Sequence, residues 1–257
     1  MDFVEVPRQR ETLSNGVASS RSSGLLSQAS IVIPVARADE SWRSLIGDLI
    51  QIGTAAELLL VGAASAPSRD GDASAARLAA PTARWVSAAA GRARQMNLGA
   101  KRSTQPFLWF LHADSRVDAD ALLALGGALE THPHALHYFD LAFQGDGPRL
   151  VRLNAWGARF RSRYLGLPFG DQGLCMSRDT FERLGGFDET AAYGEDHLLV
   201  WAAHRHRVPL HRVEGVITTS ARKYRSNGWL STTLVHGWRT WRQAIPQFGR
   251  LLWKRCG

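Results

Sequence analysis

The sequence has few of the features that mark secreted, disulfide-bonded or membrane-spanning proteins. Its only cysteines are Cys175, within an apolar segment, and Cys256, beside the C-terminus. Two cysteines so placed imply no disulfide framework and favour a reducing compartment. No apolar run has the length of a membrane-spanning helix, and the first residues lack the apolar core of a signal peptide. We therefore expect a cytoplasmic protein, or one held peripherally at the inner face of the plasma membrane.

Acidic side chains are also scarce. The 257 residues contain 31 Lys and Arg but only 23 Asp and Glu, which gives a formal net charge of +8 at pH 7. A basic field of this kind attracts nucleic acid, a phospholipid surface or a phosphorylated small substrate. No nucleic-acid recognition motif accompanies the charge, so no specific nucleic-acid partner is expected. The length and a hydrophobic content of 45% suffice for one domain with a substantial core.

Large apolar residues are few in residues 1–29, which we expect to be a disordered extension. From residue 30 to about residue 228, short apolar runs alternate with segments of helical periodicity, and this predicts an α/β domain with a mostly parallel sheet flanked by helices. The expected strands are 30–36, 57–61, 83–86, 107–111, 136–143, 208–213 and 216–220, and the expected helices are 40–52, 72–79, 92–101, 118–130, 148–165, 178–184 and 198–203. Residues 229–257 are expected to form a basic, Trp-rich helical tail.

The apolar run at 107–111 ends in the sequence His-Ala-Asp. Such a run is typical of a strand buried on both faces of a sheet. Ligands of open α/β sheets bind beyond the carboxyl ends of the strands, and residues two apart on an extended segment face the same side, so His112 and Asp114 should face a ligand. A carboxylate there suits a hard divalent cation that carries a diphosphate. The alternative is that Asp114 caps the helix expected from Asp118, or forms an Asx turn.

The helix expected after Gly91 has a basic face. Arg94, Asn97 and Lys101 recur at intervals of three and four residues, and the small and apolar residues fall on another face. Together with Arg92, the guanidinium groups and the free backbone donors at the helix start would bind phosphate. The alternative is a solvated Arg-rich surface helix.

Two later segments carry acids beside glycine. Asp171 and Gln172 lie between two glycines, which lets the backbone approach a ligand closely, and their side chains could read hydroxyl groups. The alternative is a tight turn before a strand. Glu195 and Asp196 follow Gly194 at an expected helix start, where at least one should be a capping residue and the other could be a general base.

Two basic segments contain large apolar and aromatic residues among their arginines. Residues 148–165 contain five arginines among Leu, Trp, Phe and Tyr, and residues 229–256 interleave Trp with Arg and Lys. The first segment could face an anionic acceptor, a membrane or water. The second favours an interface with lipid headgroups or with another subunit. Packing of the tail across the core domain is the equal alternative.

Five motifs in order resemble a known family. They are Ile-Val-Ile-Pro-Val, Gly-Arg-Ala-Arg-Gln-Met-Asn, Phe-Leu-His-Ala-Asp, Phe-Gly-Asp-Gln and Gly-Glu-Asp. Together they resemble family 2 glycosyltransferases of the GT-A type, and within these the bacterial group with a Leu-His-Ala-Asp signature known as radical-SAM/selenodomain-associated transferases. The resemblance covers about residues 30–224.

The resemblance implies a Rossmann-like nucleotide-binding half followed by an acceptor half. It implies inverting, hexosyltransferase-like transfer of a sugar from a nucleotide-diphosphate donor to a hydroxyl of a lipid, a glycan or a small molecule. Asp196, with Glu195, would supply the catalytic base, and Asp114 and His112 would hold Mg²⁺ or Mn²⁺. Asp171 and Gln172 would line the sugar or acceptor pocket. The donor-binding residues implied are Pro34, Arg37, Gly62, Arg92, Arg94 and Asn97.

Two positions depart from the family pattern. The family has Asn-Glu after the proline of the first strand, where this chain has Arg37-Ala38, and an acid at the end of the second strand, where it has Gly62 and small neighbours. The family residues read the base and ribose of the donor. A second hypothesis is therefore a catalytically impaired GT-A-like domain that acts as a binding or scaffold module.

Overall fold

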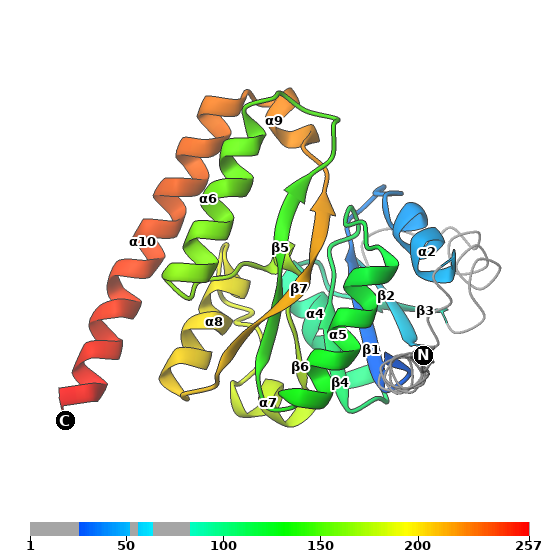
Figure 1. Cartoon of the computed structure of the whole chain (residues 1–257), viewed down its shortest axis with the longest axis horizontal. Coiled ribbons are helices and arrows are strands. Elements are labelled where there is room, and N and C mark those ends of the chain that lie inside the picture. The colour runs from blue at the N-terminus through cyan, green and yellow to red at the C-terminus, as the bar shows by residue number, and fades with distance from the viewer. Residues whose placement is uncertain (1–25, 52–55, 64–82, 257) are drawn as a thin grey trace, which may run out of the picture.

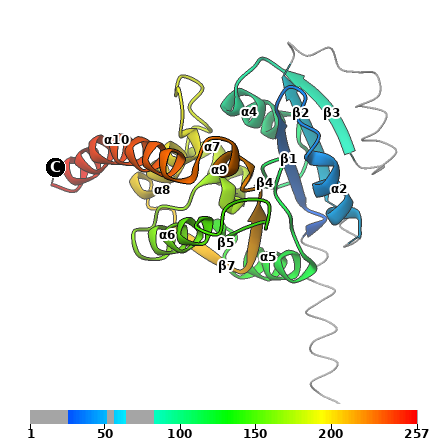
Figure 2. The same ribbon diagram turned by 90° about the horizontal axis from the view of Figure 1, so that it is seen from above.

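The computed structural model of the chain describes residues 26–51, 56–63 and 83–256, with side chains up to residue 249. Figures 1 and 2 show one central twisted sheet with helices on both faces, and a long C-terminal helix along one edge of the molecule. The helix expected at 72–79 and most of the expected N-terminal extension lie outside the described residues. The described part begins at Leu26, which is buried in the core.

The sheet has seven strands in the order β3-β2-β1-β4-β6-β5-β7. They are β1 (Ala29–Val35), β2 (Glu57–Ala63), β3 (Ala83–Ala88), β4 (Phe107–Phe110), β5 (Leu136–Phe143), β6 (Cys175–Ser177) and β7 (Leu210–Thr219). The β1–β2, β2–β3, β1–β4 and β5–β7 pairs are parallel, and only the short β6 runs antiparallel, to β4 and to β5. The prediction of a mostly parallel sheet is confirmed.

Helices cover both faces of this sheet and enclose two apolar cores. They are α2 (Trp42–Gln51), α4 (Arg92–Arg102), α5 (Ala119–Thr131), α6 (Val151–Tyr164), α7 (Arg178–Arg183), α8 (Glu195–Arg205), α9 (Arg222–Ser226) and α10 (Trp229–Cys256), with a 3₁₀ turn, η1, at Gly170–Gln172. Helices α2 and α5 contribute to one core, and α4, α7 and α8 to the other. Strand β4 alternates between the cores, since Trp109 enters the first and Leu108 and Phe110 the second, so the prediction of a strand buried on both faces is confirmed.

Helix α4 lies very close to the sheet. Its small and apolar residues are buried as the periodicity predicts, whereas Arg94 and Lys101 are exposed. A Cβ atom at Gly99 would overlap Cγ1 of Val32 on β1 and crowd Val61 on β2. Glycine at this position therefore sets the distance between α4 and the sheet, and with it the position of Arg92 at the start of the helix.

The two late strands expected at 208–213 and 216–220 form one strand, β7. Its pairing with β5 jumps from Arg212 opposite Tyr138 to Val216 opposite Asp140, which is a β-bulge. Gly215 lies in the bulge, where an added Cβ would come within 2.9 Å of Cα of Ala121. The bulge lets β7 continue and carry Thr219 to the same edge of the sheet as the end of β4.

The C-terminal helix packs on the domain, which was one of the two alternatives given for the tail. Asn154 of α6 donates to Thr233 Oγ1 at 3.0 Å and accepts from Trp229 Nε1 at 2.6 Å. Arg205 of α8 donates to Gln247 at 2.8 Å. Within the described part of the chain, no helix is both long and apolar enough to cross a membrane.

Candidate functional site

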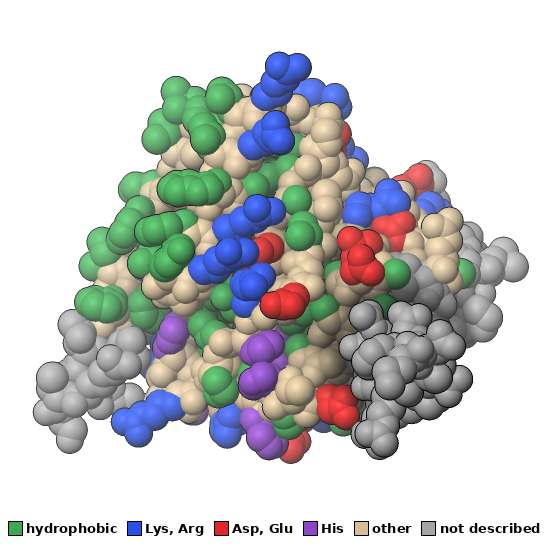
Figure 3. Space-filling view, in the orientation of Figure 1, with side chains coloured by type: hydrophobic (Ala, Val, Ile, Leu, Met, Phe, Trp, Pro, Cys, Tyr) green, Lys and Arg blue, Asp and Glu red, His purple; other side chains and the backbone are tan. Residues whose placement is uncertain are grey.

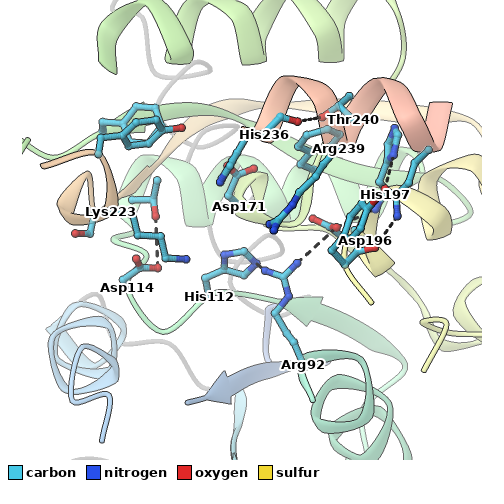
Figure 4. Close-up of a pocket in the computed structure, with 18 residues that line it drawn as sticks. Arg92, His112, Asp114, Asp171, Asp196, His197, Lys223, His236, Arg239 and Thr240 are labelled. Atoms are coloured by element: carbon cyan, nitrogen blue, oxygen red, sulfur yellow. Dashed lines mark hydrogen bonds and ion pairs between the residues drawn. The ribbon is translucent and has the colours of Figure 1, made fainter. Parts of the chain in front are cut away.

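A cavity of about 320 Å³ lies where the end of β4, the turn η1 and the start of α8 meet beneath α10 (Figure 4). Most of its polar lining comes from segments distant in sequence. The wall includes Arg92, His112, Asp114, Asp171, Asp196 and Lys223, and the roof is formed by His236, Arg239, Thr240 and Gln243 of α10. The cavity thus lies beyond the carboxyl end of β4, where open α/β sheets bind ligands.

A second cavity, of about 360 Å³, adjoins the first. It extends toward Pro34 and Asp39 at the end of β1 and is bounded on the other side by Arg222. The two cavities share Arg92, His112, Asp114, Ser220 and Lys223. His112 and Asp114 line both cavities, and Ala113 between them lines only the second. The three residues form a turn rather than an extended segment, since the N–H of Ser115 donates to the carbonyl of His112 at 3.0 Å.

Arg92 links three side chains at the junction of the two cavities. It forms an ion pair with Glu195, its Nη1 lies 3.2 Å from Nε2 of His112, and its Nη2 lies 3.5 Å from Oδ1 of Asp196 (Figure 4). Burial opposes the charge of Arg92, but Asp196 and Glu195 outweigh burial and raise its pKa. Burial and the Arg92 charge lower the pKa of His112 to about 3. His112 is therefore neutral, and its Nε2 accepts a hydrogen bond from Arg92.

The two aspartates of the first cavity differ in charge state. Asp196 accepts backbone N–H bonds from Gly170 at 2.6 Å and from His197 at 2.9 Å. Burial favours its neutral form, but Arg92 and the Gly170 N–H outweigh burial and lower its pKa. Burial raises the pKa of Asp171 to about 6, and no hydrogen-bond partner is found for its Oδ1 among the described residues. Asp196 is thus ionised at neutral pH, whereas Asp171 titrates in the range where many enzymes work.

Asp114 is not a helix cap. The cap of α5 is Asp118, whose Oδ1 accepts from the N–H of Ala121 at 2.8 Å. Asp114 instead faces the cavities, with Thr219 Oγ1 at 3.4 Å from its Oδ1. Burial raises the pKa of Asp114, and the charge of Lys223 partly offsets the effect. Figure 4 shows Lys223 directed toward this carboxylate.

The residues at the junction fit a divalent cation that arrives with a diphosphate. In the described ranges, no group of three His, Cys, Asp or Glu side chains could hold a metal ion by itself. Mg²⁺, however, is commonly bound through one or two carboxylates together with substrate phosphates and water. Asp114 can supply such a carboxylate. His112 could contribute its Nε2 only if Arg92 released that atom.

Several residues implied as donor-binding lie outside the shared junction. Asn97 accepts from the N–H of Phe187 at 2.9 Å and donates to Glu189 at 2.9 Å, so its amide holds the loop before α8. Arg94 also faces Glu189, at 3.8 Å. Arg94 instead lines a separate hollow at the start of α4. The roles of these residues in donor binding remain predictions.

Gly62, Arg37 and Gln172 also have positions that the sequence did not reveal. The indole of Trp85 covers Gly62 so closely that a Cβ there would overlap it. Arg37 is exposed beyond β1 and lines neither cavity. Gln172 is fully buried, where it donates to the carbonyl of Phe139 at 2.8 Å and accepts from the N–H of Phe169 at 3.1 Å. Its amide therefore shapes the turn that presents Asp171.

Neither acid of the Glu-Asp pair occupies the N-cap position of α8. The N-cap is Gly194, with a left-handed φ of 67°, and no side-chain capping bond is formed. Glu195 and Asp196 turn toward Arg92 instead, as described above. Asp196 still accepts one free N–H of the first turn, that of His197, so it partly serves the helix start, as expected for one of the pair. Its other oxygen is taken by the N–H of Gly170, and Arg92 pairs with both carboxylates.

The roof of the cavity was not predicted. His236, Thr240 and Gln243 recur at intervals of four and three residues, so they occupy one face of α10. Gln243 donates to the carbonyl of Tyr193 at 2.6 Å and lies 3.2 Å from Nδ1 of His197. This polar stripe within a Trp-rich helix is the sequence signal that could have identified the roof.

No protein-family model matches the sequence, and no curated protein matches it. Solved structures are similar in fold. TarS of S. aureus has a TM-score of 0.54 and 13% identity, over 75% of this chain and 35% of that protein. A structure of TarS 1–349 has a TM-score of 0.56 and 12% identity, over 75% of this chain and 58% of that one. This chain therefore spans about a third of the length of TarS (35%).

A further similar structure is that of the mannosyltransferase PcManGT from Pyrobaculum calidifontis, in complex with GDP-Man and Mn²⁺. Its TM-score is 0.63 at 15% identity, over 95% of this chain and 78% of that one. Identities this low show the fold alone, and the shared architecture agrees with the seven-stranded, mostly parallel sheet described above. The chain has a GT-A-like glycosyltransferase fold.

Proposed function

We propose that the protein is an inverting, metal-assisted glycosyltransferase that transfers a sugar from a nucleotide-diphosphate sugar to an acceptor hydroxyl. The observation that carries the proposal is the meeting of two cavities at Asp114, His112 and Arg92, beyond the end of β4. One cavity can hold the nucleotide and the other the acceptor, so that the sugar lies between a diphosphate and a carboxylate base. The GDP-Man and Mn²⁺ in PcManGT support this assignment by analogy of fold.

The donor would occupy the cavity that reaches Pro34 and Asp39. Its diphosphate would lie at the junction, where Lys223 and Arg92 supply positive charge and Asp114 would hold Mg²⁺ or Mn²⁺. When bound, the ion neutralises negative charge on the departing diphosphate. Lys223 contributes in the same direction as a fixed charge, because α9 holds it against the cavity.

The acceptor would enter the cavity beneath α10, where Asp196 takes the proton from its hydroxyl. Asp196 suits this role because it is ionised at neutral pH and is held by Gly170 and Arg92 in the wall of this cavity. Attack from this side, opposite the diphosphate, inverts the configuration at the anomeric carbon. Asp171, with a pKa of about 6, would accept a hydrogen bond from a sugar hydroxyl when ionised and donate one to it when protonated.

Isothermal titration of nucleoside diphosphates with and without Mn²⁺ tests the donor half of this proposal. We expect one nucleotide class to bind the full-length protein more tightly in Mn²⁺, and we expect Asp114→Asn to remove the effect of the metal. Asp120→Asn is the matched control, because Asp120 is exposed on the first turn of α5, away from both cavities. Equal nucleotide affinity of the Asp114→Asn variant and the wild type in Mn²⁺ would contradict the metal role.

The alternative of an impaired domain that serves as a binding or scaffold module makes a different prediction. Where the family that the sequence resembles has Asn-Glu and a strand-end acid, this chain has the exposed Arg37 with Ala38, and Gly62 covered by Trp85. An impaired module would bind a nucleotide, or a sugar, without releasing nucleoside diphosphate. Donor turnover therefore separates the two hypotheses.

A further inference from the structure

Exposed apolar side chains of this protein gather on two helices. Apart from Ile50 and Leu123, every large apolar side chain that the described part leaves exposed belongs to α6, to α10 or to the residues that flank α6. We call this set the α6–α10 face: Leu150, Leu153, Trp156, Phe160, Tyr164, Leu165, Leu230, Leu234, Val235, Trp238, Trp241, Ile245 and Phe248. Figure 3 shows these hydrophobic groups along one edge of the molecule, over α10 and α6.

The α6–α10 face follows from the helical periodicity of both helices. On α10, the exposed apolar residues between Leu230 and Phe248 recur every three or four positions, whereas Thr232, Ala244 and Gln247 on the other side are buried against the domain. On α6, Trp156 stacks on Phe160, which in turn contacts Tyr164, with ring centroids 5.8 and 5.0 Å apart. The helices lie side by side in Figure 1. The bonds of Asn154 to both ends of the Trp229–Thr233 turn join them, so the two stripes form one surface.

The charges that α6 and α10 themselves carry are all positive. Residues 147–170 and 222–256 contain no Asp or Glu. Arg152 is exposed on α6, and the guanidinium of Arg242 on α10 lies 5.0 Å from the ring centre of Trp238. Arg163 is also exposed on α6, where it pairs with Asp140 of β5. Figure 3 shows a row of Lys and Arg side chains beside the hydrophobic area, with a few Asp or Glu side chains on the side away from it. An apolar strip bordered by arginine complements a lipid surface, which has anionic headgroups on the outside and apolar acyl chains just below them.

We propose that the α6–α10 face docks the protein on an anionic phospholipid bilayer. Trp side chains prefer the boundary between headgroups and acyl chains, and arginines at that depth reach the phosphates. A second copy of the chain fits less well, because it would bring arginine-bordered surfaces together without any acid on either helix to pair with them. The docking surface is separate from the cavities, so the inference does not depend on the proposed enzymatic function.

Vesicle sedimentation of the full-length protein tests the proposal. We expect binding to vesicles of phosphatidylcholine with phosphatidylglycerol at low salt, and little binding to phosphatidylcholine alone. Replacing Trp156, Trp238 and Trp241 by serine should abolish binding. These side chains are 67%, 59% and 65% exposed, so the core stays intact. The matched control is Ile50→Ser with Leu123→Ser, two exposed apolar residues outside the face, and it should bind like the wild type.

Charge variants test the anionic component separately. Arg152→Gln and Arg242→Gln lie outside the cavities, and each should lower the partition coefficient about fivefold, because a basic residue at an anionic surface contributes on the order of 1 kcal/mol. Equal sedimentation of the wild type and the triple Trp variant would overturn the proposal. The proposal would also be overturned if the wild type bound no vesicles and formed, in sedimentation velocity, a dimer that the Trp substitutions dissociate. Nucleotide titration of the triple variant should match the wild type, which keeps failure of docking distinct from failure of the proposed enzymatic function.

Discussion

Replacing Asp196 with asparagine should separate its catalytic role from its structural one. The carboxylate accepts two backbone N–H bonds, from Gly170 and His197, and faces Arg92. Asparagine retains one acceptor oxygen but turns an NH₂ group toward the other donor, so one hydrogen bond to a charged group is lost. Such a bond contributes about 1.5–3 kcal/mol to the free energy of unfolding. For a domain of this size, that loss lowers Tm by about 3–12 °C.

The expected effect of the same substitution on turnover is much larger than its effect on stability. A positioned general base contributes roughly two to four orders of magnitude in rate, so kcat for sugar transfer should fall by that factor while nucleotide affinity stays unchanged. The assay is release of nucleoside diphosphate from the nucleotide sugar, measured well below the Tm of the variant. A rate within about threefold of wild type would refute the assignment of the base. The base would instead be Asp171 if Asp171→Asn abolished turnover and the pH–rate profile of the wild type rose with a pKa near 6.

Three further predictions concern charge and packing. Asp171→Asn should raise Tm at pH 7.5, because burial raises the pKa of the Asp171 carboxyl in the folded protein and so makes its ionised form destabilising. The wild-type protein loses stability as pH rises from about 4, where the carboxyl ionises in the unfolded chain, to about 6, where it ionises in the folded protein. In thermal melts, the gain in Tm over wild type should therefore vanish below about pH 4. Gly99→Ala should lower the free energy of unfolding by about 1–3 kcal/mol in urea titrations because its Cβ overlaps Val32, whereas Gly127→Ala, which meets no atom within 4 Å in α5, should be neutral or raise it. Lys223→Gln should weaken nucleoside diphosphate binding but not nucleoside binding, and equal losses for both ligands would contradict its placement beside the phosphates.

Sequence periodicity predicted most of the fold because the residues that each helix or strand buries follow the period of that element along the sequence. The run at 107–111 alternates between two cores, and α4 buries its small face, as the pattern requires. The division of β7 into two strands failed because a bulge at Gly215 has the same local signature as a turn. Only the neighbouring strand decides between a bulge and a turn.

The sequence predicted those residues of the candidate site that a strand end positions. It did not predict those whose position depends on contacts with segments distant in sequence. His112 and Asp114 face the cavities because β4 ends there, which the apolar run indicates. Glu195 and Asp196 looked like helix caps because Arg92, more than a hundred residues earlier, is invisible to a local pattern. The contribution of α10 to the cavity was likewise hidden, since its Trp and Arg residues dominate the sequence and its inward polar stripe is discontinuous.

Turnover of nucleotide sugars by the full-length protein tests the central claim most directly. Release of nucleoside diphosphate should be measured over a panel of uridine, guanosine, cytidine and adenosine diphosphate sugars, with Mn²⁺ or Mg²⁺ and after chelation of both. We predict turnover with the sugars of one nucleotide, dependent on the metal, abolished by Asp114→Asn and unaffected by Asp120→Asn. Binding of a nucleotide without turnover of any sugar, or turnover that is indifferent to both the metal and Asp114, would contradict the account of two cavities joined at a metal-assisted transfer site.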